Sequence, residues 1–171
     1  MMRWLFVLAA TFTLTAPALA ASTLPGGATT LTETHDDWTV HCTVANGPVR
    51  CAAQQQQLSS QTRQRVLGIE IVGGDGDVLT GTLVLPFGLL LSKGAVLKVD
   101  DKVTSPPEPF QTCLPSGCIV PLNIGKDWLA AMRSGTAIAV AAVAVNGQDA
   151  KFSISLKGLG SALDRIADLT K

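Results

Sequence analysis

Four cysteines grouped into two closely spaced pairs constrain this chain more than any other feature. Asn46-Gly47, midway between Cys42 and Cys51, is typical of a tight β-hairpin turn. Counting outward from that turn places Cys42 opposite Cys51 at a non-hydrogen-bonded position, where side chains approach most closely. Pro48 lacks the N–H that a tight turn uses, so a wider loop is the alternative. The sequence therefore predicts a hairpin closed by a disulfide.

The second pair, Cys113 and Cys118, flanks Leu114-Pro115-Ser116-Gly117, which suits a type I turn. Spacing alone permits three connectivities, and the turn chemistry favours two local disulfides, each worth about 2–3 kcal/mol. A four-thiolate zinc site is the alternative. Such a site usually has two to four residues between the two cysteines of each pair, and more residues than that separate Cys42 from Cys51.

An export signal precedes the cysteines. Arg3 supplies the positive charge, Trp4 to Leu14 form the apolar run, and Ala18-Leu19-Ala20 match a cleavage site. The apolar run is too short to span a membrane. We therefore predict a signal peptide over residues 1–20, no transmembrane anchor in the mature chain, and a periplasmic or secreted location in which thiols pair.

Composition limits the remaining choices. The chain is 47% hydrophobic and 15% charged, with 13 basic and 13 acidic residues. An apolar, weakly charged chain buries enough surface to fold, which excludes disorder. The absence of a basic surplus disfavours nucleic acid as a partner. We predict a flexible N-terminal segment over 21–35 and a single domain over 36–171.

Alternating apolar residues predict many short strands in that domain. Trp38, Val40 and Cys42 share one face of a strand, and Leu67, Ile69 and Ile71 share another. Further strands are expected at 78–85, 95–99, 136–145 and 151–157, and the strand at 136–145 is expected to be buried on both faces. The pattern predicts an all-β sandwich.

Two short peripheral helices interrupt the strands. Asp127 is expected to cap a helix over 128–134, with Gly135 just past its end. Ser161 and Asp164 form a capping-box pattern that opens a second helix. Apolar residues at helical spacing should dock the second helix on the sandwich; they are Leu163, Ile166 and Leu169.

His35, Asp36, Asp37 and His41 form the compact cluster of potential metal ligands. Asp37 and His41 lie about 13 Å apart along an extended strand, too far to share an ion. If His35-Asp36 folded back toward His41, these residues could still bind a metal ion, so a metal site is the alternative. The favoured interpretation is a strand edge exposed to solvent. We therefore predict no metal site and no cofactor.

The sequence indicates no enzyme. It has no G-x-S-x-G nucleophile motif. Because every cysteine is expected in a disulfide, no thiol is left to act as a nucleophile. A glycosidase needs two carboxylates close together in space. The sequence has two neighbouring pairs, Asp100-Asp101 and Asp75/Asp77, but both pairs are better explained as turn residues. Gln54–Gln57 is interpreted as strand or loop surface, and Leu83 to Leu97 as core strands joined by turns rather than a membrane-active hairpin.

The landmarks together resemble the invasion-associated locus B (IalB) family of exported alphaproteobacterial proteins. The matching residues are Trp38, Cys42, Cys51, Leu85-Pro86-Phe87-Gly88-Leu89-Leu90, Pro109-Phe110, Cys113, Gly117-Cys118 and Ser155-Leu156-Lys157-Gly158. This resemblance spans roughly residues 36 to 165. It implies an immunoglobulin-like β-sandwich in the periplasm or beyond, associated in some members with entry into host cells. It implies no catalytic residues.

We therefore expect a non-enzymatic interaction module with an unknown protein partner in the envelope or on a host surface. The loops expected to bear contacts are Ser105–Pro109 and the tips near Asn46 and Ser116. One alternative is a periplasmic small-ligand binder with an apolar cavity between the sheets near Phe87 and Phe110. The other is a hydrolase with an unrecognised site.

Overall fold

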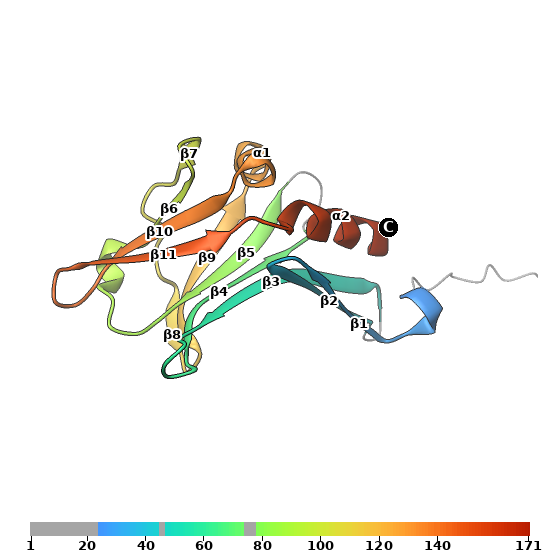
Figure 1. Ribbon diagram of the computed structural model, residues 1–171, viewed down its shortest axis with the longest axis horizontal. Coiled ribbons are helices and arrows are strands. Elements are labelled where there is room, and N and C mark those ends of the chain that lie inside the picture. Colours follow the sequence, from blue (N-terminus) through green and yellow to red (C-terminus); the bar gives the residue numbers. More distant parts are fainter. Residues whose placement is uncertain (1–23, 45–46, 74–77) are drawn as a thin grey trace, which may run out of the picture.

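Two antiparallel sheets dominate the computed structural model, which describes residues 24–44, 47–73 and 78–171 (Figure 1). The larger sheet has seven strands, in the spatial order β1 (Thr30–His35), β2 (Trp38–Val44), β3 (Val49–Leu58), β4 (Arg65–Val72), β5 (Leu79–Leu85), β9 (Gly117–Ile124) and β8 (Thr112–Leu114). The smaller sheet has four, in the order β11 (Asp149–Ser155), β10 (Ala137–Val143), β6 (Val96–Val99) and β7 (Val103–Thr104). Short helical segments complete the described chain: η1 (Pro25–Gly27), η2 (Leu91–Lys93), α1 (Lys126–Ser134) and α2 (Leu159–Leu169).

The core lies on one face of the larger sheet, beneath the smaller sheet and α2. Trp38, Val40 and Cys42 of β2 are fully buried, and β4 buries Leu67, Ile69 and Ile71, as their alternation predicts. The larger sheet runs β1 to β5 as a meander. The mostly-β, two-sheet architecture with two helices is thus confirmed, and the immunoglobulin-like topology stays a prediction.

Both local disulfides are present. Cys42 lies opposite Cys51 in the β2–β3 register with a Cα–Cα distance of 4.0 Å, and Thr43 and Val44 follow the register counted from the predicted turn. Cys113 lies opposite Cys118 in the β8–β9 hairpin, 3.9 Å apart at Cα. All four thiols are therefore used as predicted, and the four-thiolate zinc alternative is wrong.

The N-terminal region differs from the sequence prediction. Residues 30–35 form edge strand β1, which pairs along its whole length with β2, and Leu24 is fully buried in the core. In β1, exposed threonines alternate with Leu31, Glu33 and His35, which face inward. The many threonines make this alternation hard to recognise in the sequence. The flexible segment predicted over 21–35 is thus wrong from Leu24 onward. The predicted signal peptide, 1–20, lies outside the described residues.

Both helices begin earlier than predicted, after glycine rather than after a capping side chain. α1 begins at Lys126 behind Gly125, so Asp127 lies in its first turn near the positive end of the helix dipole. α2 begins behind Gly158, and the hydroxyl of Ser161 donates back to the Gly158 carbonyl at 3.0 Å. The predicted docking face is confirmed by the burial of Leu163 and Ile166.

Strand β10 is central in its sheet, but only one of its faces is covered. Ile138 and Val140 are buried, whereas Ala139 and Ala141 are exposed. The prediction of burial on both faces is wrong because alanine is small enough to be tolerated on an open sheet face. Among the described helices, none is long and apolar enough to cross a membrane.

Glutamine side chains from β3 close the free edge of β11. Gln55 donates from Nε2 to the Ser155 carbonyl at 3.0 Å and accepts the Ser155 amide at 3.2 Å, so its side chain bonds both backbone groups. Gln57 donates to the Ser153 carbonyl at 2.5 Å, and the Trp38 indole donates to the Ser155 carbonyl at 2.9 Å. The glutamine run therefore satisfies a sheet edge that would otherwise be open to strand addition.

Candidate interaction surface

Three of the four residues considered as potential metal ligands, His35, Asp36 and Asp37, hold the β1–β2 turn against the junction of β11 and α2. Asp36 pairs with Lys157 at 3.0 Å, an interaction that raises the pKa of that lysine. Asp37 accepts the Ser155 hydroxyl at 2.6 Å, and His35 Nδ1 lies 3.2 Å from the Ser161 hydroxyl. These side chains join two segments far apart in sequence.

His41 lies on the opposite face of the sheet from this junction, with its Nδ1 3.1 Å from the Thr32 hydroxyl. Within the described ranges, no three His, Cys, Asp or Glu side chains gather as a metal site would require. Sequence reasoning missed the bidentate pair between Arg165 of α2 and Glu33 of β1, at 2.8 and 2.7 Å. The Arg165 guanidinium lowers the pKa of the Glu33 carboxyl and fixes α2 on the edge of the sheet.

The paired carboxylates of Asp100 and Asp101 diverge. Asp100 accepts the Thr136 amide at 2.9 Å, the Thr136 hydroxyl at 2.8 Å and the Ala137 amide at 3.2 Å. These bonds, the Thr136 amide foremost, lower the pKa of Asp100 and anchor the start of β10. Asp101 instead pairs with Lys98 at 2.7 Å. Asp75 and Asp77 lie outside the described residues.

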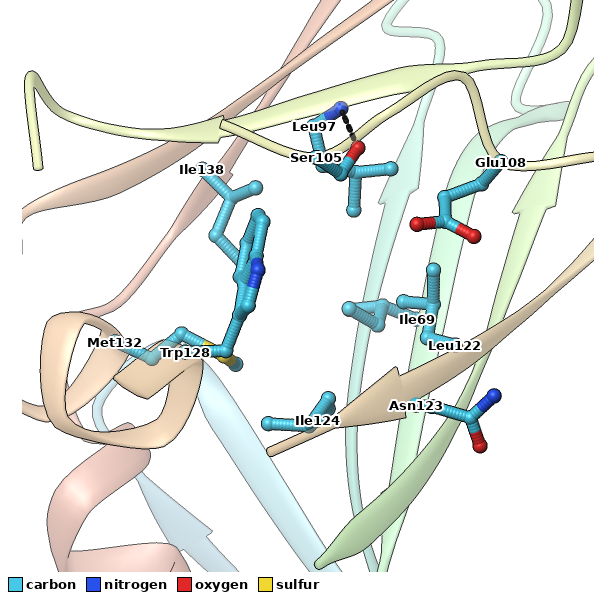
Figure 2. A pocket seen from close by; sticks show the side chains of 10 residues that line it. All are labelled: Ile69, Leu97, Ser105, Glu108, Leu122, Asn123, Ile124, Trp128, Met132 and Ile138. Atoms are coloured by element: carbon cyan, nitrogen blue, oxygen red, sulfur yellow. Dashed lines mark hydrogen bonds between the residues drawn. The ribbon is translucent and has the colours of Figure 1, made fainter. Parts of the chain in front are cut away.

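A pocket between the sheets has a volume of only about 30 Å³ (Figure 2). Its lining residues are Ile69, Leu97, Ser105, Glu108, Leu122, Asn123, Ile124, Trp128, Met132 and Ile138. Such a volume suits about one water molecule, whereas small-molecule sites usually measure ~300 Å³ or more. Ser105 is buried there, where its hydroxyl accepts the Leu97 amide at 3.0 Å.

The predicted position of the apolar cavity is wrong. Phe87 is 61% exposed on a loop at one end of the sandwich, and Phe110 packs against the core without lining the pocket. Ser105–Pro109 is a loop as expected, but it covers the pocket and contributes Ser105 and Glu108 to its wall. The tip near Asn46 lies outside the described residues.

Large exposed hydrophobic side chains lie on turns at the end of the two sheets that faces away from α1 and α2 (Figure 1), a region that we call the loop end. In this region the β3–β4 loop lies beside the β8–β9 turn, the β10–β11 turn lies beside η2, and the segment from β5 into η2 runs between the two pairs (Figure 1). The loop end comprises the β3–β4 loop (59–64), the segment from β5 into η2 (86–93), the β8–β9 turn (115–116) and the β10–β11 turn (144–148). Its exposed members are Leu58 (52%), Phe87 (61%), Leu91 (42%), Leu114 (51%) and Val145 (67%). Val78, the one remaining large hydrophobic exposed in the described ranges, lies beside the opposite end of β5.

Backbone bonds hold Phe87 out from the core. Gly88 adopts a left-handed conformation (φ +85°) directly after Phe87, and the buried Leu89 bridges to Ala144. The Val145 amide donates to the Gly88 carbonyl at 2.9 Å, which places Val145 beside the same loop. The loop is therefore anchored on both sides while its aromatic ring faces outward.

The β3–β4 and β8–β9 turns meet beside Phe87. Gln64, Arg65, Pro86, Phe87, Pro115, Ser116 and Gly117 line an open groove of about 460 Å³. Gly117 (φ +131°) is required because a Cβ there would lie 2.6 Å from the Leu85 carbonyl oxygen. In the other turn, the Ser59 hydroxyl accepts the Thr62 amide at 3.2 Å, which orders the segment that leads to Arg65.

Of the loops that sequence reasoning selected, the Ser116 tip lies in this groove. Phe87 was considered as a cavity residue and as part of the family resemblance but not as a contact residue, although Pro86-Phe87-Gly88 places an aromatic ring between two turn formers. That local pattern is the signal that could have identified it. The fold and this surface together define a class: two-sheet β proteins with two local disulfides and an apolar loop end.

The particular family follows from comparison with known proteins. The model of the invasion associated locus B (IalB) protein family matches residues 38–167, and the chain belongs to that family. An invasion protein B homolog of Brucella abortus is 48% identical over 166 residues, covering 96% of this chain and 95% of that protein. Invasion protein B of Bartonella bacilliformis is 34% identical over 160 residues, covering 92% and 84%.

A solved structure shows the same fold. The crystal structure of invasion associated protein B from Bartonella henselae matches with a TM-score of 0.75 at 33% identity, covering 81% of this chain and 96% of that one. The resemblance inferred from the cysteine pairs and the Leu85–Leu90 segment is thereby confirmed.

Proposed function

We propose that this chain is an exported, non-enzymatic interaction protein that supports association with host cells through its loop end. The observation that carries the proposal is the concentration of exposed Phe87, Leu114 and Val145, with two further leucines, at one end of the sandwich. Exposed apolar clusters on a folded domain usually mark contact surfaces. The word invasion in the names of the Brucella and Bartonella relatives supports the biological setting.

Export and the lack of catalysis are parts of the same proposal. Two disulfides suit an oxidising compartment outside the cytoplasm. The side chains that could serve chemistry have structural partners instead: Asp36 binds Lys157, Asp37 binds Ser155, and Asp100 binds the start of β10. Small-ligand binding has less support because the pocket between the sheets has room for about one water.

A cell-binding experiment tests the contact surface. The oxidised protein carries a fluorophore, and its binding to cultured host cells is measured by flow cytometry. Replacing Phe87→Ser together with Leu114→Ser is expected to weaken binding at least about tenfold, because both side chains lose apolar area that a contact would bury. The midpoint of chemical unfolding should change little, since both positions are exposed.

The matched control is Val78→Ser, which removes a comparably exposed side chain at the opposite end of β5 and should leave binding intact. Equal binding by wild type and the double variant, or no binding by wild type, would contradict the proposal. A protein partner in the envelope or on a host surface stays a prediction. Measuring binding to cells whose surface proteins have been removed by protease tests it.

A further inference from the structure

We infer that the loop end binds the surface of an anionic lipid bilayer. This inference rests on the proposed function and names the partner of the same surface. The apolar side chains of Phe87 and Val145 stand on loops, that of Leu91 stands at the start of η2, and that of Leu114 stands at the end of β8. The fold brings these parts of the sequence to one end of the molecule (Figure 1). Side chains presented in this way can enter the boundary between headgroups and acyl chains without a preformed pocket.

The charges at the loop end support an anionic partner. Although the whole chain carries equal numbers of acidic and basic residues, residues 58–65 contain Arg63 and Arg65, residues 86–94 contain Lys93, and neither segment contains an acid. Residues 111–117, the third segment, have no charge. None of the three cations forms an ion pair within the part of the chain that the structure describes.

Two acidic residues border these segments: Glu70 lines a groove on the larger sheet together with Arg65, and the Glu108 carbonyl accepts the Ala95 amide at 2.9 Å, next to Gly94. Asp149, which follows the β10–β11 turn, lies 3.7 Å from Lys151. The loop-end segments 58–65, 86–94 and 111–117 thus carry three cations and no acid of their own beside their exposed apolar side chains. Cations placed beside inserted apolar side chains lie at the depth of lipid phosphates, where anionic headgroups attract them.

The groove beside Phe87 fits a lipid headgroup. Arg65 and Gln64 supply donors at its wall, and Pro86, Phe87 and Pro115 supply apolar surface. A phosphate can bind the guanidinium while its acyl chains contact the ring of Phe87. Two backbone hydrogen bonds close the β3–β4 loop directly before Arg65: the Arg63 amide donates to the Ser59 carbonyl at 2.9 Å, and the Ser59 amide donates to the Gln64 carbonyl at 2.8 Å.

The residue types favour a bilayer over a protein partner. Four of the five exposed hydrophobics are leucine or valine, and the chain has no tyrosine. Leucine and valine are under-represented among the residues that dominate protein interfaces, where tryptophan, tyrosine and arginine prevail. A fluid apolar layer accepts aliphatic side chains without the shape complementarity that a protein partner requires.

Vesicle co-sedimentation tests this inference with the oxidised wild-type chain. We expect binding to mixed phosphatidylcholine and phosphatidylglycerol vesicles, and at least about tenfold weaker binding to phosphatidylcholine alone. Phe87→Ser with Leu114→Ser should reduce binding to both kinds of vesicle. Arg63→Gln with Arg65→Gln should remove the preference for phosphatidylglycerol, and added salt should do the same. The controls Val78→Ser and Lys151→Gln should bind like wild type.

The outcomes separate this inference from the proposed function. If the chain bound host cells through Phe87 and Leu114 but did not bind vesicles, the inference that its partner is a lipid bilayer would be wrong. The partner would then be a protein. Binding to vesicles that is insensitive to the loop-end variants, or that Val78→Ser weakens as much as Phe87→Ser with Leu114→Ser does, would also overturn it. Failure on cells and vesicles alike would reject both proposals.

Discussion

Replacing Gly158 with alanine is expected to lower the free energy of unfolding by about 3 kcal/mol or more. Gly158 has φ +89°, and a Cβ there would lie 2.0 Å from the carbonyl oxygen of His35. Because the obstacle is backbone, the β1–β2 turn must move away from the start of α2. That movement would weaken the bonds that Asp36 and Asp37 form with Lys157 and Ser155. Chemical denaturation of the oxidised protein measures the loss.

Gly147→Ala is the matched control for this variant. Gly147 also has a left-handed backbone (φ +83°), but no heavy atom lies within 4 Å of the Cβ that alanine would add. Gly147→Ala should therefore lower the free energy of unfolding by only about 1–2 kcal/mol, the cost of a left-handed backbone conformation for alanine. Equal destabilisation by the two substitutions would show that the close approach of Gly158 to His35 does not matter for stability.

Replacing Gln55 with alanine is expected to cost about 2–3 kcal/mol, the second large effect. The substitution removes the hydrogen bonds to the Ser155 amide and carbonyl and leaves a space in the core, where Gln55 is 7% exposed. The carbonyl keeps its bond from the Trp38 indole, whereas the amide loses the partner that the structure shows. Equilibrium unfolding in denaturant measures the change.

Gln56→Ala is the control for Gln55→Ala, because the neighbouring side chain is exposed on the outer face of the same strand. It should change the free energy of unfolding by no more than about 0.5 kcal/mol. Hydrogen exchange at the Ser155 amide should accelerate in the Gln55 variant and not in the Gln56 variant. Unchanged exchange at Ser155 would mean that Gln55 does not protect the edge of β11.

Local turn chemistry made part of this structure predictable. The Cys42–Cys51 register follows from Asn46-Gly47, and the Cys113–Cys118 register from a Pro-Ser turn, because each hairpin spans only a few residues. Strand β1 was missed because threonine at every second position gives weak hydrophobic contrast with Leu31 and Glu33. The helix starts were misplaced because glycine rather than a capping side chain precedes each of them.

The loop end depends on contacts that no local pattern contains. Pairing of β5 with β9 brings Pro115 beside Phe87, and the bridge between Leu89 and Ala144 adds Val145. Likewise, nothing in Gln54–Gln57 shows that Gln55 faces the core and bonds Ser155, one hundred residues away. Sequence reasoning could therefore identify the family and the disulfides, but the surface emerged only from the arrangement of the strands.

Hydrogen–deuterium exchange of the protein bound to membranes from host cells tests the central claim most directly, because it locates the contact surface without assuming the partner. We expect new protection in residues 59–65, 86–93, 114–116 and 144–148. The edge strand β1 and the α2 helix should exchange as they do in the free protein. Protection confined to β1 or to the outer face of the larger sheet, with the loop end unchanged, would contradict the account.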